Sequence, residues 1–177
     1  MTADNNALLA VTGDYYGARA KGIVIRNGKL YRDTSFADIC VLFADGVMET
    51  YTKTEFSIDS AMERRAYQAW SFGPRLLDNG KPIEEFTDSV KRKNPRCAIG
   101  YYEPGHYCLV VVDGRQPGYS VGMTLAELSR LFFDLGCKTA YNLDGGQTAM
   151  MIFEGKPVNQ AYNGGRQCSD IIYFGRK

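Results

Sequence analysis

The sequence has a single histidine and no apolar run that approaches the length of a membrane span. A helix that crosses a bilayer needs about 20 consecutive apolar residues, so we expect no membrane span in this chain. The first ten residues also lack the charged and apolar regions of a signal peptide. His106 is the one possible base for a serine or cysteine triad, and the turn that contains it favours a solvent-facing position.

An excess of charge of either sign is missing too. Twenty-one basic residues stand against twenty acidic ones, which gives a net charge of +1. A nucleic-acid groove or a polybasic membrane arm would need a clear positive excess. We therefore expect no nucleic-acid partner, and we expect a ligand to be held by a local site.

The spacing of cysteines that zinc sites use is absent as well. The five cysteines are odd in number, widely spaced and without a C-x-x-C pair, which argues against a zinc site or a dense disulfide framework. Most are expected to be small core residues. Cys108 and Cys137 each lie in or beside an apolar segment, so we expect them to be buried, reduced thiols.

What the sequence does contain is a series of hairpin signals. Asn27-Gly28 separates two strand-like segments and predicts a tight turn, and further turns separate 39–43 from 47–51 and 97–102 from 107–112. The continuously apolar segment 107–112 is typical of a central strand. At 177 residues the chain fits one domain that buries roughly two thirds of its unfolded surface.

Two segments predict helices. Residues 60–70 carry helix-forming residues after a possible cap, and residues 124–135 combine a capping box with an apolar stripe before Gly136. Residues 3–8 look like the last turn of a helix whose beginning is missing. The predicted fold class is α+β, a mixed β-sheet rich in hairpins with a few flanking helices, in a single domain over residues 1–177.

Three apolar strands end in an aspartate beside glycine, at Asp14, Asp113 and Asp144. The clearest case is KTAYNLDGGQTAMMIF, where Gly145-Gly146 would admit a ligand close to the main chain, although a hairpin with a capping aspartate remains an equal alternative. The helix at 124–135 joins two of these strands. If they run parallel, Asp113 and Asp144 emerge at the same edge of the sheet.

Several motifs along the chain resemble those of one enzyme family. They read TGDYYGAR, IRNGKLYR, SFGPRLLDNGK, NPRCAIG, VVVDGRQPGYSVGMTLAEL, LGCKTAYNLDGGQTAMM, GKPVN and GGRQCSD. Taken in this order, the motifs are similar to those of the phosphodiester glycosidase family. Two positions differ from the family pattern. Thr12-Gly13 stands where the family usually has Asn-Gly, and Gln147-Thr148-Ala149 stands where it usually has a small residue and serines. The resemblance implies hydrolysis of a sugar-1-phosphodiester, and it implies that strands preceding the first motif are missing.

The residues agree with this chemistry. A phosphate leaving group needs little help from a general acid, whereas its charge calls for cations. The predicted catalytic residues are Asp144, Asp113 and Asp14. The predicted substrate-binding residues are Arg96, Arg115, Asn142, Gly145, Gly146, Thr148 and Arg166. This reading needs no cofactor, and a divalent cation is left open.

Two rival functions remain at this point. A metal-assisted phosphodiesterase would use Asp14, Asp113, Asp144 and Asn142 as oxygen ligands. A non-catalytic module would keep the arginines and bind an anionic glycan. The family resemblance implies a phosphosugar or anionic polysaccharide as partner, such as a bacterial surface polysaccharide. It favours an extracellular or cell-surface protein whose anchor has been removed, with a cytoplasmic location left open.

Overall fold

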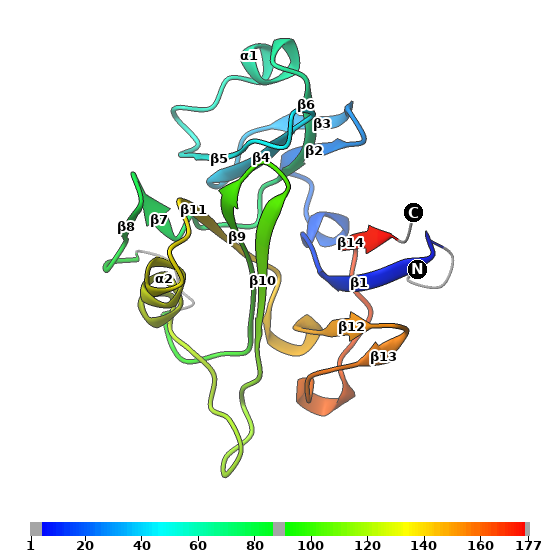
Figure 1. The fold of residues 1–177 in the computed structure, drawn as a ribbon, viewed down its shortest axis with the longest axis vertical. Coiled ribbons are helices and arrows are strands. Elements are labelled where there is room, and N and C mark those ends of the chain that lie inside the picture. Colours follow the sequence, from blue (N-terminus) through cyan, green and yellow to red (C-terminus); the bar gives the residue numbers. More distant parts are fainter. Residues whose placement is uncertain (1–4, 87–90, 176–177) are drawn as a thin grey trace.

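The computed structural model describes residues 5–86 and 91–175, so the predicted loop or short helix at 84–93 lies partly outside the described residues. Within those ranges the chain is mostly β, with two α-helices and four sheets whose strand pairs are all antiparallel (Figure 1). The strands are β1 (Ala7–Thr12), β2 (Gly22–Arg26), β3 (Lys29–Thr34), β4 (Ile39–Phe43), β5 (Met48–Tyr51), β6 (Ala66–Trp70), β7 (Leu77–Asp78), β8 (Lys81–Pro82), β9 (Arg96–Glu103), β10 (His106–Val112), β11 (Thr139–Leu143), β12 (Met151–Phe153), β13 (Lys156–Pro157) and β14 (Ile171–Gly175). The helices are α1 (Ile58–Glu63) and α2 (Leu125–Asp134), with short 3-10 turns at Tyr16–Ala18, Gly146–Thr148 and Tyr162–Gly164.

The predicted hairpins are confirmed, and the predicted mixed sheet is wrong. Asn27 and Gly28 both have positive φ, at 52° and 76°, as a tight turn between antiparallel strands requires. Asn79 and Gly80 repeat this conformation between β7 and β8. Because short turns join most neighbouring strands, the pairings come out antiparallel, and the strands divide into the orders β13-β12-β1-β14, β10-β9-β11, β3-β2-β6-β4-β5 and β7-β8.

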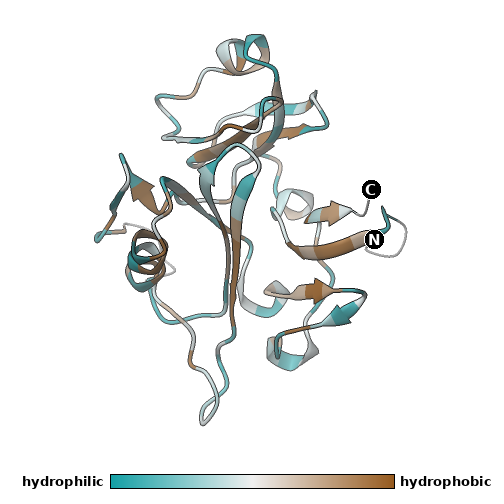
Figure 2. Cartoon of the chain, in the orientation of Figure 1, coloured by the Kyte–Doolittle hydropathy of each residue, from teal (hydrophilic) through white to brown (hydrophobic). Residues whose placement is uncertain are grey.

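The sheet β10-β9-β11 carries the best-predicted part of the chain. Both outer strands are antiparallel to β9, so β10 and β11 run in the same direction, and Val112 and Leu143 lie at the same end. The prediction of a central position for 107–112 is wrong, because β10 is an edge strand of this sheet. It is apolar because both faces are covered: Val110 packs with the cluster around α2, and Leu109 packs with the cluster around Tyr141. Figure 2 shows β10 brown along much of its length.

Helix α2 is confirmed, with the predicted capping box. The Thr124 side chain accepts a hydrogen bond from the Glu127 amide, and the Glu127 side chain accepts one from the Thr124 amide. Its buried side chains, among them Leu128 and Phe132, pack on the face of the sheet formed by Ala98 and Ala140. The helix therefore holds β11 in place before the chain reaches Asp144.

The helix predicted at 60–70 is wrong in its second half. The helix α1 ends at Glu63, Arg65 takes a φ of 61°, and residues 66–70 form β6 between β2 and β4. Burial of Ala66, Ala69 and Trp70 in the sheet outweighs the helix propensity of the segment. The helical turn predicted for residues 3–8 lies partly outside the described residues, and it is wrong from Ala7, where β1 begins.

The first and last strands bring distant segments together. β1 pairs with β14, and Thr12 lies opposite Ile171, so the loop after β1 meets the loop before β14. Figure 1 shows the two strands side by side near the marked ends of the chain. Among the described residues, no helix has the length and apolar character needed to cross a membrane.

Candidate active site

A cavity of about 160 Å³ opens where β11 ends. Six of the predicted site residues line it, namely Arg96, Arg115, Asn142, Asp144, Gly145 and Gly146. Phe72, Asn94, Pro95 and Leu143 complete the wall. The cavity therefore gathers residues from the loop after β6, the start of β9, the loop after β10 and the turn after β11.

The turn after Leu143 is built on close contact with Pro95. A Cβ atom at Gly145 would lie 2.6 Å from the Pro95 carbonyl oxygen, so a side chain there would push the two segments apart. Gly146 has a φ of 64° and donates its amide hydrogen to the same carbonyl over 2.9 Å. The Asp144 amide donates to the Gly13 carbonyl over 2.9 Å, which fixes the turn to the loop after β1. The two glycines are thus required by packing and by backbone conformation.

Asp144 places a largely buried carboxyl group at this cavity. The residue is 5% exposed, and the Thr148 hydroxyl donates to its Oδ2 over 2.8 Å. Burial raises the pKa of Asp144 above its ordinary value, while the Thr148 hydrogen bond and the charges of Arg166 and Arg19 act in the opposite direction. Within the described residues no hydrogen bond reaches Oδ1, so this oxygen is free for a ligand or a water molecule.

Asn142, two residues earlier on β11, contributes an unsatisfied acceptor. Its Nδ2 donates to the Gly73 carbonyl over 2.7 Å, and its backbone amide donates to the Pro74 carbonyl over 3.0 Å. Its Oδ1 is buried and has no hydrogen-bond partner among the described residues. A buried acceptor without a hydrogen bond costs about 1–3 kcal/mol, so its presence calls for an explanation, such as a functional role or a bound water molecule.

The three predicted arginines occupy different environments. Arg115 is exposed at the cavity, and its Nε and Nη2 donate to Asn94 Oδ1 over 3.1 and 2.9 Å. Arg166 is exposed, lies 5.3 Å from the centre of the Tyr15 ring, and is close enough to Asp144 to lower its pKa. Arg96 is buried and donates to the carbonyl groups of Met123 and Arg92, both over 2.9 Å. Of the three, Arg115 and Arg166 are the ones exposed to solvent.

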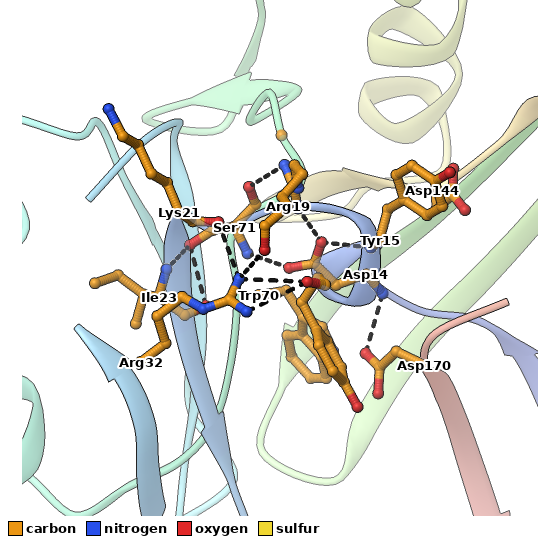
Figure 3. A network of polar contacts seen from close by, with 12 residues as sticks. Asp14, Tyr15, Arg19, Lys21, Ile23, Arg32, Trp70, Ser71, Asp144 and Asp170 are labelled. Carbon is orange, nitrogen blue, oxygen red and sulfur yellow. Dashed lines mark hydrogen bonds and ion pairs between the residues drawn. The ribbon is translucent and has the colours of Figure 1, made fainter. Parts of the chain in front are cut away.

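Asp14 lies near Asp144 but is fully buried, and its carboxylate is occupied. Its Oδ1 accepts from the Tyr15 amide over 2.6 Å and forms an ion pair with Arg19, while its Oδ2 accepts from the Ser71 amide over 2.8 Å. Figure 3 shows this network converging on Asp14. The negative charge of Asp14 contributes to the raised pKa of Asp144, so the two carboxylates are electrostatically coupled.

Asp113 follows β10 at the predicted end of the sheet, but its side chain points to another loop. It accepts hydrogen bonds from Asn159 Nδ2 over 2.7 Å, the Gln160 amide over 2.9 Å and the Tyr119 hydroxyl over 2.9 Å. Asp113 is not among the residues that line the cavity. The direction of β10 thus agrees with the sequence-based prediction, but the Asp113 carboxylate points to the loop at 159–160 and not into the cavity.

Sequence reasoning missed several residues of this region. Phe72 and Asn94 line the cavity, and Arg19 is stacked against Phe72 at 5.5 Å from the ring centre. All three lie inside the quoted motifs TGDYYGAR, SFGPRLLDNGK and NPRCAIG, which was the available signal. Asp170, the last residue of the motif GGRQCSD, accepts a hydrogen bond from the Asp14 amide and pairs with Arg26 over 2.6 Å. The motif marks the residue, but only the fold shows these distant partners.

The aspartates do not gather into a metal site. In the ranges 5–86 and 91–175, no group of three or more histidine, cysteine, aspartate or glutamate side chains is placed to hold a metal ion. Asp14 and Asp113 direct their oxygens to separate sets of protein donors. The arrangement therefore gives no support to the metal-assisted alternative.

Known proteins resemble this chain in sequence and in fold. The family model described as phosphodiester glycosidase matches residues 5–175. The SPbeta prophage-derived uncharacterized protein YomE of Bacillus subtilis is 34% identical over 152 residues, which is 81% of this chain and 23% of that protein. The chain thus spans about a quarter of the length of this relative.

Solved structures share the fold. The catalytic domain of zebrafish N-acetylglucosamine-1-phosphodiester alpha-N-acetylglucosaminidase, auto-inhibited by its pro-peptide, matches with a TM-score of 0.81 and 22% identity, over 99% of this chain and 66% of that chain. A hypothetical protein from Synechocystis matches with a TM-score of 0.66 and 13% identity, over 97% and 52%. A candidate exported protein of Burkholderia pseudomallei matches with a TM-score of 0.65 and 15% identity, over 99% and 67%. The family match over residues 5–175 shows that the chain belongs to the phosphodiester glycosidase family.

Proposed function

We propose that this chain hydrolyses the bond between the anomeric carbon of a sugar and the phosphate of a sugar-1-phosphodiester, releasing the sugar and a phosphomonoester. The observation that carries the proposal is the Asp144 carboxyl group, which lies in the cavity with one oxygen held by Thr148 and the other free. Membership of a family of glycosidases supports the reaction class.

In this proposal Asp144 acts on the sugar side of the scissile bond. Its carboxylate stabilises the positive charge that develops at the anomeric carbon, or accepts a proton from the attacking water. Because burial weakens solvent screening, a negative charge at this position acts more strongly than one in water. Thr148 fixes the orientation of the carboxyl group, and Asn142 Oδ1 offers an acceptor to a sugar hydroxyl.

The phosphate side needs positive charge more than it needs an acid. A phosphodiester leaves as a weak base, so a second carboxylic acid is less necessary than in an ordinary glycosidase. Asp14 and Asp113, both fully engaged with protein donors, are accordingly assigned to positioning roles. Arg115 at the cavity and Arg166 near Asp144 are proposed to bind the phosphate oxygens, and Arg96 supports the cavity wall.

The substrate class follows by analogy with the family. The zebrafish neighbour is named for its action on an N-acetylglucosamine-1-phosphodiester. We take the methyl phosphodiester of N-acetylglucosamine-1-phosphate as a first probe, and a phosphodiester-linked surface polysaccharide as the larger substrate. A location outside the cell would suit such a polymer, and one structural neighbour is a candidate exported protein.

The test is turnover of this probe with and without a chelator of divalent cations. The proposal predicts release of sugar and methyl phosphate at an unchanged rate with chelator. It predicts a loss of kcat on the order of 10²-fold or more in Asp144→Asn, with little change in KM. Asp33→Asn, on an exposed position of β3, is the matched control and should keep full activity.

Each rival function gives a different result in the same assay. A metal-assisted phosphodiesterase would lose activity with the chelator and regain it with added magnesium. A non-catalytic module would bind the probe without turnover. Full activity of a folded Asp144→Asn protein would remove this residue from the mechanism and with it most of the site assignment.

A further inference from the structure

Two cysteines meet in the β10-β9-β11 sheet, away from the end that carries Asp144. Cys108 on β10 pairs with Gly100 on β9, whereas β11 reaches the active-site end opposite Cys97. Cys137 follows α2, just before β11, and a Cβ atom at Gly100 would lie 2.7 Å from its Sγ. The Cys137 sulfur therefore fills the space that the missing side chain of Gly100 leaves.

This arrangement places the two cysteine side chains next to each other under α2. Directly paired residues on antiparallel strands carry their side chains on the same face, with Cβ positions roughly 4.5–5.5 Å apart. Cys108 is the partner of Gly100, so its thiol is on the face that the Cys137 thiol occupies. Cys108 and Tyr102 both pack against the apolar cluster that contains Cys137.

The two thiols differ in access to solvent. Cys137 is 4% exposed, in the cluster under α2, while Cys108 is only partly buried at the edge strand. The expectation of two buried thiols therefore holds for Cys137 and fails for Cys108. A small reagent can reach Cys108 first, and Cys137 is then the neighbouring thiol.

We propose that Cys108 and Cys137 form a dithiol site that is converted to a disulfide by exchange with a small-molecule disulfide such as glutathione disulfide. The Cys108 thiolate attacks one sulfur of the reagent, which forms a mixed disulfide and releases one glutathione thiolate. The Cys137 thiolate then attacks the Cys108 sulfur and releases the second glutathione thiolate. Two electrons pass from the protein to the reagent, and the two thiol protons go to the two glutathione molecules.

Tyr102 assists the second step. Burial raises the pKa of the Cys137 thiol, and the hydrogen bond from the Tyr102 hydroxyl opposes this effect by stabilising the thiolate. Removing the hydroxyl should therefore slow the closure. Tyr102→Phe is the variant that isolates this contribution.

The bond would tie β10 to the connection between α2 and β11 across the central strand β9. It closes a loop that includes the whole of α2, so it should restrict the unfolded chain and stabilise the fold. Asp144 lies beyond the opposite end of β11, which begins at Thr139. We therefore expect a change in stability with the turnover of the active site preserved.

The test is incubation of the native protein with excess glutathione disulfide at mildly alkaline pH, followed by intact-mass analysis and peptide mapping. The proposal predicts a product lighter by two hydrogen atoms, with three of the five cysteines still alkylated after denaturation and a Cys108–Cys137 cross-linked peptide. The melting temperature should rise by on the order of 5–10 °C and return when a reductant is added. Cys168→Ser should give the same product.

Cys108→Ser and Cys137→Ala should both abolish the cross-link, and Cys137→Ala should stop at a mixed disulfide on Cys108. If a variant fails to fold, the peptide map of the wild-type protein still decides. A stable mixed disulfide in the wild type, a cross-link that involves another cysteine, or five free thiols after prolonged incubation would each overturn the proposal.

Discussion

At the scale of single residues, the central feature is a carboxyl group whose charged form is disfavoured by burial. Asp144 has one strong donor, the Thr148 hydroxyl, and lies near the cations Arg19 and Arg166, yet burial still raises its pKa. A buried carboxylate is less well solvated than one in water, so it stabilises a positively charged transition state more strongly. The same property makes it costly to the fold.

This cost predicts a pH-dependent gain in stability for Asp144→Asn. Because the folded state raises the pKa, the contribution of this residue to stability is fully present below its unfolded pKa, about 3.9, and is lost as the pH rises through the folded value. The difference in melting temperature between Asp144→Asn and wild type should therefore grow from pH 4 towards pH 7, in thermal scans across that range. Asp33→Asn should show no such trend, and a constant difference for Asp144→Asn would refute the raised pKa.

Asp14 should behave as a positioning residue. Replacing it with asparagine leaves the Arg19 guanidinium without its carboxylate in a largely buried place, which should lower the free energy of unfolding by on the order of 3 kcal/mol in urea titrations. Because the charge of Asp14 raises the pKa of Asp144, the acidic limb of the pH–rate profile should move to lower pH in Asp14→Asn. A larger loss of kcat than in Asp144→Asn would instead make Asp14 the catalytic group.

The sequence could identify the aspartates but not the direction of their side chains. Strand, aspartate and glycine recur at Asp14, Asp113 and Asp144, and all three positions are local in the sequence. What separates them are partners that lie far along the chain: Ser71 for Asp14, and the loop at 159–160 for Asp113. No single-sequence pattern reports such contacts.

At the scale of elements, the turn after β11 depends on the absence of a side chain at Gly145. In Gly145→Ala the new methyl group would meet the Pro95 carbonyl oxygen, so the turn must move away from β9 and take Asp144 with it. We expect a loss of kcat of at least about tenfold with the fold retained, since a displacement of the reacting group by an ångström has effects of this order. Gly175→Ala is the control, because its nearest contacts are at 3.8 Å. Unchanged activity in Gly145→Ala would show that the turn does not position the site.

Helix α2 allows the stability of the fold to be tested separately from catalysis. Thr124→Ala removes the side-chain cap from the Glu127 amide and should cost about 1 kcal/mol of stability, seen as a lower urea midpoint with an unchanged slope. Turnover at 25 °C should stay at the wild-type value, because Thr124 does not line the cavity. A loss of activity without loss of stability would contradict this division.

Elements with strong local signals were predicted, and elements set by distant pairing were not. The capping box of α2 and the Asn-Gly hairpins are decided within a few residues. The alanines of β6 favour a helix in the sequence-based prediction, but pairing with β2 and β4 outweighs this helix propensity. The sequence does not reveal that β10 is an edge strand. Both of its faces are covered, so its residues are as continuously apolar as those of a central strand.

At the scale of the whole molecule, the cavity lies where separate parts of the fold meet. The turn after β11 is hydrogen-bonded to Gly13, which follows β1, and to Pro95, which precedes β9. Asn142 is hydrogen-bonded to Gly73, which follows β6. The site therefore exists only in the folded chain, although its motifs are spread over most of the sequence. Activity should disappear in the same cooperative transition that unfolds the sheets.

The most direct measurement of the central claim is the fate of the oxygen atom from water. The methyl phosphodiester of N-acetylglucosamine-1-phosphate is hydrolysed in water enriched in heavy oxygen, and both products are analysed by mass spectrometry. Attack at the anomeric carbon, as proposed for a site built around Asp144, places the label in the sugar and leaves the methyl phosphate unlabelled. Label in the methyl phosphate would mean cleavage at phosphorus and would contradict the proposed glycosidase reaction.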